Sequence, residues 1–387
     1  MRWISEPPRT RRDDPRIKAG LRAAAFARAG GADGLRGLGV TLMGNGEFRE
    51  AISAFELSRR AGAAAFSEWR HLAAAYFAVG RYEDVLSTCD AAAPNVRGLV
   101  ELRARALERL GGEDASCDAY IRSLHDGASP STLYQTLALL TRRGEIARML
   151  DVCAALPDRL RDTPPVLAFR AIALSFAGDE EGARRLIDPE RHVARVRFEP
   201  PATSGGLERF NDRLADAIRT ASPSVETRDG FTLQHSPRLG DSEEFAALCG
   251  FVRTEMERYI DEMPSRGLSD VMPAAPIGGI LHAASVILTH DGSNGEHLHA
   301  DGYLSAVYHV RVPAELSGAN DQRGALAVGA CESIAHDHVP CWKTRYITPE
   351  AGWLTIMPSH VFHDVVPTGI DSPRISLAFD LQPVAVK

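Results

Sequence analysis

The chain has 387 residues and a formal net charge of −7, with 44% hydrophobic and 25% charged residues. Composition and length are those of an ordinary globular protein with two domains. The acidic balance argues against a nucleic-acid binder, and no stretch approaches the roughly 18 apolar residues of a membrane span. The N-terminus shows no apolar signal sequence, and the six cysteines form no Cys-x-x-Cys pair. We therefore expect a cytoplasmic protein with reduced thiols.

The first half of the chain carries a short sequence motif that recurs every 31 to 34 residues. Each copy begins with a glycine, at Gly46, Gly80, Gly111, Gly144 and Gly178. The period, and the aromatic and Ala positions of the first two copies, resemble the tetratricopeptide repeat, in which glycine fits the turn between two helices because its φ is positive. We predict a helical repeat domain over residues 1–190. Its concave surface could bind a peptide or protein substrate, or the stack could be purely structural; homo-oligomerisation stays open.

The second half, residues 191–387, has a different pattern of apolar residues. Apolar residues recur every three or four positions over 207–220 and 243–263, which predicts two helices. Short strands are expected at 285–288, 304–312, 324–328, 345–347, 353–357 and 374–381. A series of short strands after flanking helices favours a double-stranded β-helix, or jelly roll, so the fold class is α+β. The chain contains no glycine-rich nucleotide motif.

Two segments of this half carry candidate metal ligands. His297, His299 and Asp301 alternate, so in an extended segment all three share one face. His363 follows much later in the chain. Two imidazoles and one carboxylate on a β scaffold form the facial triad of non-haem Fe(II) oxygenases, so we predict His299, Asp301 and His363 as the catalytic metal ligands. Arg374, shortly after His363, is what a dicarboxylate cosubstrate would need.

The segment Gly302–Pro313 resembles the Gly-Trp-Leu-Ser-Gly-Val-Tyr-Tyr-Val…Pro signature of 2-oxoglutarate/Fe(II) oxygenases, which often follow tetratricopeptide repeats. The segments around Trp353, His363 and Arg374 resemble the closing part of that family, and the resemblance covers roughly residues 195–385. Relatives often lack an acid at the position of Asp301. His297 is therefore the alternative third ligand, although we favour the carboxylate because it partly neutralises Fe(II).

The resemblance implies Fe(II), 2-oxoglutarate and O2 as cofactor and cosubstrates. 2-Oxoglutarate is oxidatively decarboxylated to succinate and CO2 while a C–H bond of a peptide, protein or natural-product substrate is hydroxylated. Arg374 would hold the distal carboxylate of 2-oxoglutarate by a bidentate pair, and Ser376, on the same strand face, would add a hydrogen bond. Tyr308 or His309 could also contact it, but only one of these neighbours can point inward.

Two other functions remain open. One is a cupin-like metalloenzyme that uses His297, His299 and His363 without 2-oxoglutarate, and the other is a non-catalytic repeat scaffold with a decayed site. Three further histidines are given no ligand role. His360 is expected to be exposed, and His336 and His338 are expected in a loop near the mouth of the site. The sequence does not distinguish hydroxylation from desaturation.

Overall fold

The structure is a computed structural model, and it describes residues 1–3, 22, 25, 30–61, 66–92, 98–125, 129–220, 224–228, 231–235, 242–316, 322–336 and 338–384. Side chains are not described at 66–68, 224–228 and 231–235. The chain forms two compact units, one of residues Pro8–Leu140 and one of Met1–Pro7 with Thr141–Lys387. The change from helix to strand, where we expected the domain boundary, lies later, near residue 190.

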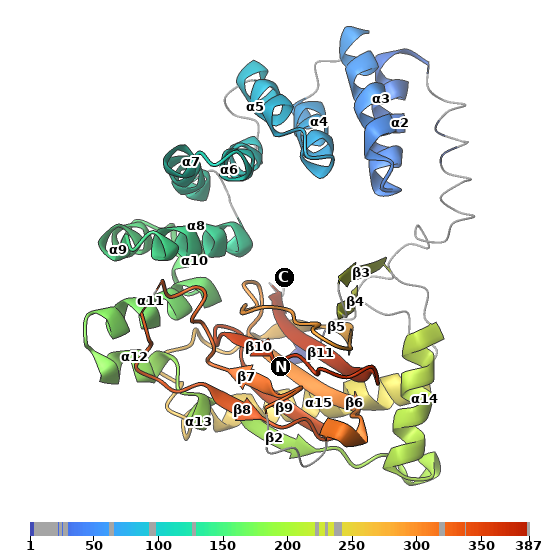
Figure 1. Cartoon of the computed structure of the whole chain (residues 1–387), viewed down its shortest axis with the longest axis vertical. Coiled ribbons are helices and arrows are strands. Elements are labelled where there is room, and N and C mark those ends of the chain that lie inside the picture. The colour runs from blue at the N-terminus through green and yellow to red at the C-terminus, as the bar shows by residue number, and fades with distance from the viewer. Residues whose placement is uncertain are drawn as a thin grey trace. The chain divides into compact units, whose positions relative to one another are not determined.

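The first unit consists of helical pairs (Figure 1). Its helices are α2 (Gly31–Gly44), α3 (Phe48–Arg60), α4 (Phe66–Ala78), α5 (Tyr82–Ala91), α6 (Leu99–Arg109), α7 (Glu113–His125) and most of α8 (Pro130–Arg142). Each pair has a glycine between its two helices. These are Gly46, Gly80 and Gly111, with φ values of 80°, 76° and 76°. Only glycine adopts this left-handed conformation without steric cost. Phe55 and Leu72 are fully buried in the core of this unit, where hydrophobic burial stabilises the pairs.

The repeated helical pairs continue into the second unit. Its helices are α9 (Ile146–Ala154), α10 (Asp158–Arg161), α11 (Pro164–Phe176), α12 (Glu180–Leu186) and α13 (Pro189–His192). Gly144 joins α8 to α9 with a φ of 69°, and Gly178 joins α11 to α12 with a φ of 77°. All five glycines therefore turn the chain between two helices, which confirms the repeat prediction.

An eight-stranded sheet forms the main layer of the second unit. Its strands are β1 (Arg2–Trp3), β2 (Ala194–Arg197), β3 (Ser224–Arg228), β4 (Phe231–His235), β5 (Gly278–Leu288), β6 (Leu304–Arg311), β9 (Trp353–Pro358) and β11 (Arg374–Val384). They pair in the order β2-β9-β6-β11-β5-β4-β3, and β1 pairs with β5 in parallel. Helices α14 (Leu207–Thr220) and α15 (Glu243–Glu262) pack their buried apolar side chains with those of this sheet. The Ser242 hydroxyl caps α15 by accepting from the Phe245 amide at 3.2 Å.

A second sheet of three strands has the order β10-β7-β8. Its strands are β7 (Leu326–Val328), β8 (Arg345–Ile347) and β10 (His363–Val365). The two sheets form a curled β domain that follows the helical repeat region in the chain, so the predicted fold class is confirmed. Among the described helices, none is at once long and apolar enough to cross a bilayer.

Most elements of the second unit match their predicted positions. Helix α14 and strand β8 have the predicted bounds, and β6, β9 and β11 differ from them by a few residues. Strands β1, β3, β4 and β10 were not predicted. The β10 segment is short and includes His363 and Asp364, so no run of apolar or alternating residues marks it. It becomes a strand because β7 pairs with it, with His363 opposite Val328.

Candidate metal and anion site

Three histidines come together where the two motif segments meet. His297 and His363 exchange two backbone hydrogen bonds, of 3.1 and 2.9 Å, and so form an isolated bridge between segments far apart in the sequence. The side chains of His297, His299 and His363 each offer a ligand atom, and these atoms lie within 4.8 Å of one another. The Nε2 atoms of His299 and His363 are 3.2 Å apart.

Each imidazole is oriented by a hydrogen bond at its other ring nitrogen. The Nδ1–H group of His299 donates to the Asp380 carboxylate at 2.7 Å. The Nδ1–H group of His297 donates to the Gly295 carbonyl at 2.7 Å, and that of His363 to the Val361 carbonyl at 3.1 Å. Because Nδ1 holds the proton in a neutral imidazole, Nε2 carries a lone pair. At His297 this lone pair accepts from the Asn294 side-chain amide at 3.1 Å. Three lone pairs therefore converge, which is the arrangement that a metal cation requires.

The electrostatic environment keeps two of these imidazoles neutral. Burial, assisted by neighbouring His299, lowers the pKa of His297 to about 4. Burial, with His297 and His299 nearby, also lowers the pKa of His363 well below its usual value. Burial acts in the same direction on His299, but the Asp380 carboxylate outweighs it and raises the pKa of His299. Two cis ligands of an octahedral ion with bonds near 2.1 Å are about 3 Å apart, which matches the His299–His363 distance.

Asp301, the predicted carboxylate ligand, is not part of this group. The extended conformation ends after His299, because Ala300 and Asp301 form a turn in which the Gly302 amide donates to the His299 carbonyl at 3.1 Å. The expectation that Asp301 shares a face with the two histidines is therefore wrong. Its side chain is exposed. Among the described residues, the ligand group holds His297 in the place that we had given to the acid.

Asp380 is the carboxylate that the structure brings to the histidines. Its second oxygen accepts from the Ser305 hydroxyl at 2.7 Å, and Ser305 in turn contacts the Ser359 hydroxyl at 2.8 Å. Burial would raise the pKa of Asp380, but His299 overcomes this and holds the pKa below its usual value. The sequence carried a signal for this residue. Alternation along the predicted strand places Asp380 on the same face as Arg374 and Ser376.

At the other end of the site, Arg374 is a buried cation. It is 1% exposed, and burial lowers its pKa to about 10. Among the described residues it makes no ion pair with a carboxylate, and its Nε–H group has no hydrogen-bond partner. An unpaired buried guanidinium is costly unless an anion joins it, so this end suits a carboxylate ligand.

His309 rather than Tyr308 faces Arg374. The Arg374 guanidinium donates to His309 Nδ1 at 3.3 Å, and Ser376 Oγ lies 3.2 Å from the same nitrogen. Burial, assisted by the Arg374 charge, lowers the pKa of His309 well below its usual value, so the ring is neutral. Tyr308 points away and donates from its hydroxyl to the Asn211 side chain of α14 at 2.8 Å.

A cavity of about 290 Å³ joins the two ends. All three histidines, Asp380, Arg374 and Ser376 line it, and most of its remaining wall is apolar. The apolar lining residues are Ala284, Val286, Leu288, Ala306, Val307, Leu326, Val365 and Ala378. Alternate residues of β11 point into it, since Arg374, Ser376, Ala378 and Asp380 all line the wall. The residues present therefore fit a metal ion together with a small dicarboxylate.

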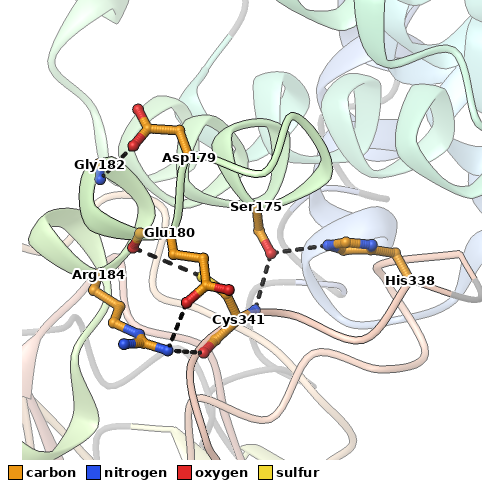
Figure 2. A network of polar contacts seen from close by, with 7 residues as sticks. All are labelled: Ser175, Asp179, Glu180, Gly182, Arg184, His338 and Cys341. Carbon is orange, nitrogen blue, oxygen red and sulfur yellow. Dashed lines mark hydrogen bonds and ion pairs between the residues drawn. The ribbon is translucent and has the colours of Figure 1, made fainter.

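The other histidines singled out in the sequence lie elsewhere. His360 is 1% exposed and its Nε2–H group donates to the Leu186 carbonyl at 2.7 Å, so the expectation of an exposed residue is wrong. His338 bonds to the Ser175 hydroxyl at 2.8 Å (Figure 2). Its ring stacks on Phe176. Asp337, between His336 and His338, lies outside the described residues, and neither histidine belongs to the described metal-ligand group.

Comparison with known proteins bears on this half of the chain. Residues 284–380 match the sequence model of a family described as "Putative 2OG-Fe(II) oxygenase". This segment is a 2OG-Fe(II) oxygenase domain. It contains the three histidines, Asp301, Asp380 and Arg374. The resemblance noted in the sequence is confirmed, and the chain is an oxidoreductase of this general kind. A search of curated proteins gives no match.

Several solved structures resemble parts of the oxygenase chain. A Pseudomonas putida prolyl-4-hydroxylase is 16% identical, with 50% of this chain and 94% of that one covered and a TM-score of 0.33. A Burkholderia pseudomallei 2OG-Fe(II) oxygenase-family protein is 14% identical, with coverages of 50% and 85% and a TM-score of 0.31. The TPR protein YrrB, described as having an unusual peptide-binding site, is 13% identical, with coverages of 45% and 89% and a TM-score of 0.33.

Proposed function

We propose that this oxygenase hydroxylates an unactivated C–H bond of a peptide, protein or natural-product substrate. When bound, Fe(II) and 2-oxoglutarate supply the oxidising chemistry, in which O2 and 2-oxoglutarate become succinate and CO2 while the substrate C–H gains one oxygen atom. The observation that carries the proposal is the pairing, in one cavity, of three convergent imidazole lone pairs with a buried arginine that makes no ion pair with any described carboxylate.

We assign the metal to the Nε2 atoms of His297, His299 and His363. The hydrogen bonds at the three Nδ1 atoms support this set, because they fix the tautomer in which each Nε2 carries a lone pair. At His297 the metal would replace the Asn294 amide that donates to Nε2. The set with Asp301 in place of His297 is the alternative. Without a carboxylate ligand, the Asp380 carboxylate would still supply negative charge to the cation through the His299 imidazole.

We assign the distal carboxylate of 2-oxoglutarate to Arg374. Within the described part of the chain, the Nε–H group of the guanidinium has no partner, and a charge-assisted pair would satisfy it. His309 accepts one hydrogen bond from Arg374 without cancelling its charge. Ser376 lies beside both residues and supports the same role. The apolar wall would exclude water, which strengthens each of these electrostatic contacts.

The test is anaerobic addition of Fe(II) and 2-oxoglutarate to metal-free protein, with the visible charge-transfer band of the chelated cosubstrate as the readout. We expect the band in the wild-type chain. In Arg374→Ala, half-saturation should need more than about tenfold more 2-oxoglutarate, because a charge-assisted hydrogen bond is lost. Bound iron without a band would favour the cupin-like alternative, and the absence of iron binding would favour the non-catalytic scaffold.

For the substrate, we favour a peptide or protein segment that the helical unit binds. A cavity of about 490 Å³ in that unit is lined by charged groups of both signs, among them Glu101, Arg105, Glu108 and Arg109. Such a wall suits a polar chain better than an apolar natural product. The test is succinate release with candidate peptides. Arg105→Ala and Arg109→Ala should raise KM for a peptide substrate and leave kcat unchanged, whereas unchanged KM would count against this role.

A further inference from the structure

The turn that carries His363 is held by helices of the last repeat. Phe362, directly before the ligand, is fully buried and meets the fully buried Phe169 of α11 edge to face, with ring centroids 5.7 Å apart. His360, three residues before the ligand, donates to the Leu186 carbonyl at the end of α12. One apolar contact and one buried hydrogen bond therefore connect this helical pair to the chain on the N-terminal side of His363.

A second connection runs through the loop between β7 and β8. Figure 2 shows Ser175 of α11 between the His338 ring and the Cys341 amide, with distances of 2.8 and 2.9 Å. Arg184 of α12 donates to the Cys341 carbonyl at 2.9 Å (Figure 2). These contacts fix one end of the loop on the same helical pair.

The other end of that loop reaches the first histidine motif. The Glu296 carboxylate accepts from the backbone amides of Glu332 and Ser333 at 3.0 and 2.8 Å. Glu296 directly precedes His297. The helical pair α11–α12 thus contacts the turn before His363 directly. It is linked to the residue before His297 only indirectly, through the loop between β7 and β8.

We propose that the last helical pair is a positioning element of the metal site, and that His360 and Phe169 are its positioning residues. They hold the turn so that the His363 ring presents Nε2 to the cation. The inference rests on the proposed metal site, but it concerns a part of the chain that the repeat pattern assigns to the helical repeat stack. In this role the fifth repeat is an integral part of the oxygenase rather than a part of that stack.

The effect of positioning differs from that of general stabilisation. A residue that only stabilises the fold shifts the unfolding transition and leaves the metal affinity of the folded protein unchanged. A positioning residue changes the metal affinity of protein that remains folded. Partners that orient metal ligands typically contribute about 10- to 100-fold to metal affinity.

The experiment measures the Fe(II) dissociation constant of the full chain under anaerobic conditions, first without 2-oxoglutarate and then with it. We expect His360→Ala and Phe169→Ala to bind Fe(II) about tenfold more weakly than wild type at a temperature where circular dichroism shows both folded. His360→Gln keeps an N–H donor within reach of the Leu186 carbonyl and should restore the affinity to within about threefold.

The matched control is Phe55→Ala. Phe55 is also a fully buried helical phenylalanine, but it belongs to the core of the other unit. This variant should unfold at a lower temperature and bind Fe(II) as wild type does. If it weakens Fe(II) binding as much as Phe169→Ala, the effect is general destabilisation and the inference is wrong.

Two further outcomes separate this inference from the proposed function. Wild-type protein that binds Fe(II) without the charge-transfer band would contradict the 2-oxoglutarate function, while the Fe(II) affinities would still decide the positioning role. Equal Fe(II) affinity in wild type and folded His360→Ala would overturn the positioning role alone. Should the alanine variants fail to fold, Phe169→Leu removes the edge-to-face ring contact with a smaller loss of volume and should also weaken Fe(II) binding. Full wild-type affinity in folded Phe169→Leu would then count against the positioning role. No Fe(II) binding by wild type would overturn both.

Discussion

The two ends of the cavity have opposite electrostatic characters, although strand β11 contributes to both. At one end Asp380 orients His299, and neutral imidazoles present lone pairs. At the other end Arg374, which pairs with no carboxylate of the described residues, lies beside the neutral His309. Asp380, which lies at the metal end, and Arg374, which lies at the anion end, are therefore only six positions apart on the same strand.

At both ends the neighbouring groups orient the ligand-binding side chains without neutralising their attraction for a ligand. A buried charge is costly, so most are cancelled within the fold. Here His309 satisfies part of the Arg374 guanidinium without supplying a negative charge, and backbone carbonyls fix two histidines without making them cationic. The metal end therefore still favours a cation, and the Arg374 end still favours an anion. Four substitutions test this difference.

The largest effect is expected from His363→Ala, which removes one convergent nitrogen at the metal end. Fe(II) affinity should fall more than about 100-fold, beyond the loss that follows from removing an orienting partner. Iron content after anaerobic loading and desalting measures this. The control is His338→Ala, which removes a histidine that lies outside the ligand group. Equal iron content in wild type and His363→Ala would refute the metal end as described.

Asp380→Asn should weaken Fe(II) binding about 10- to 100-fold, because the amide keeps the shape of the carboxylate but not its charge or its hold on His299 Nδ1–H. Asp301→Asn is the matched change at the residue that the sequence favoured, and it should leave the affinity unchanged. Isothermal titration with Fe(II) distinguishes the two. The reverse result would restore Asp301 as the ligand.

At the anion end, His309→Glu should supply Arg374 with an internal counter-ion. 2-Oxoglutarate would then bind about tenfold more weakly, because the guanidinium is already paired and the added charge repels the ligand. His309→Gln keeps a neutral acceptor for Arg374 and should bind 2-oxoglutarate nearly as wild type does. The titration of the charge-transfer band measures both, and Fe(II) affinity should not change in either. Equal binding in the two variants would show that the charge at this end is irrelevant.

The smallest effect is expected from Ser376→Ala. It removes one neutral hydroxyl that contacts His309, so half-saturation should need about threefold more 2-oxoglutarate. The same titration gives the value. A loss as large as that in Arg374→Ala would mean that the hydroxyl, rather than the guanidinium, dominates recognition.

Local signals in the sequence were sufficient for the elements and for the chemical type of the site. The repeating glycines require a left-handed turn that other residues adopt at a cost, so the helical pairs were predictable from spacing. Alternation along β11 correctly implied that Arg374 and Ser376 share a face. The same alternation, carried six residues further, would have revealed Asp380.

Only the tertiary structure decided which side chains meet. A turn after His299 moves Asp301 away, and the bridge to His363 brings His297 in, although the sequence pattern gives both candidates the same spacing from His299. The choice of His309 over Tyr308 depends on which face of β6 packs on α14, where Asn211 accepts the tyrosine hydroxyl. The burial of His360 depends on α12, more than 170 residues away in the chain. The sequence determines local conformation because backbone sterics and periodicity act over a few residues. The ligand set depends on pairings between distant segments, and no local pattern specifies these.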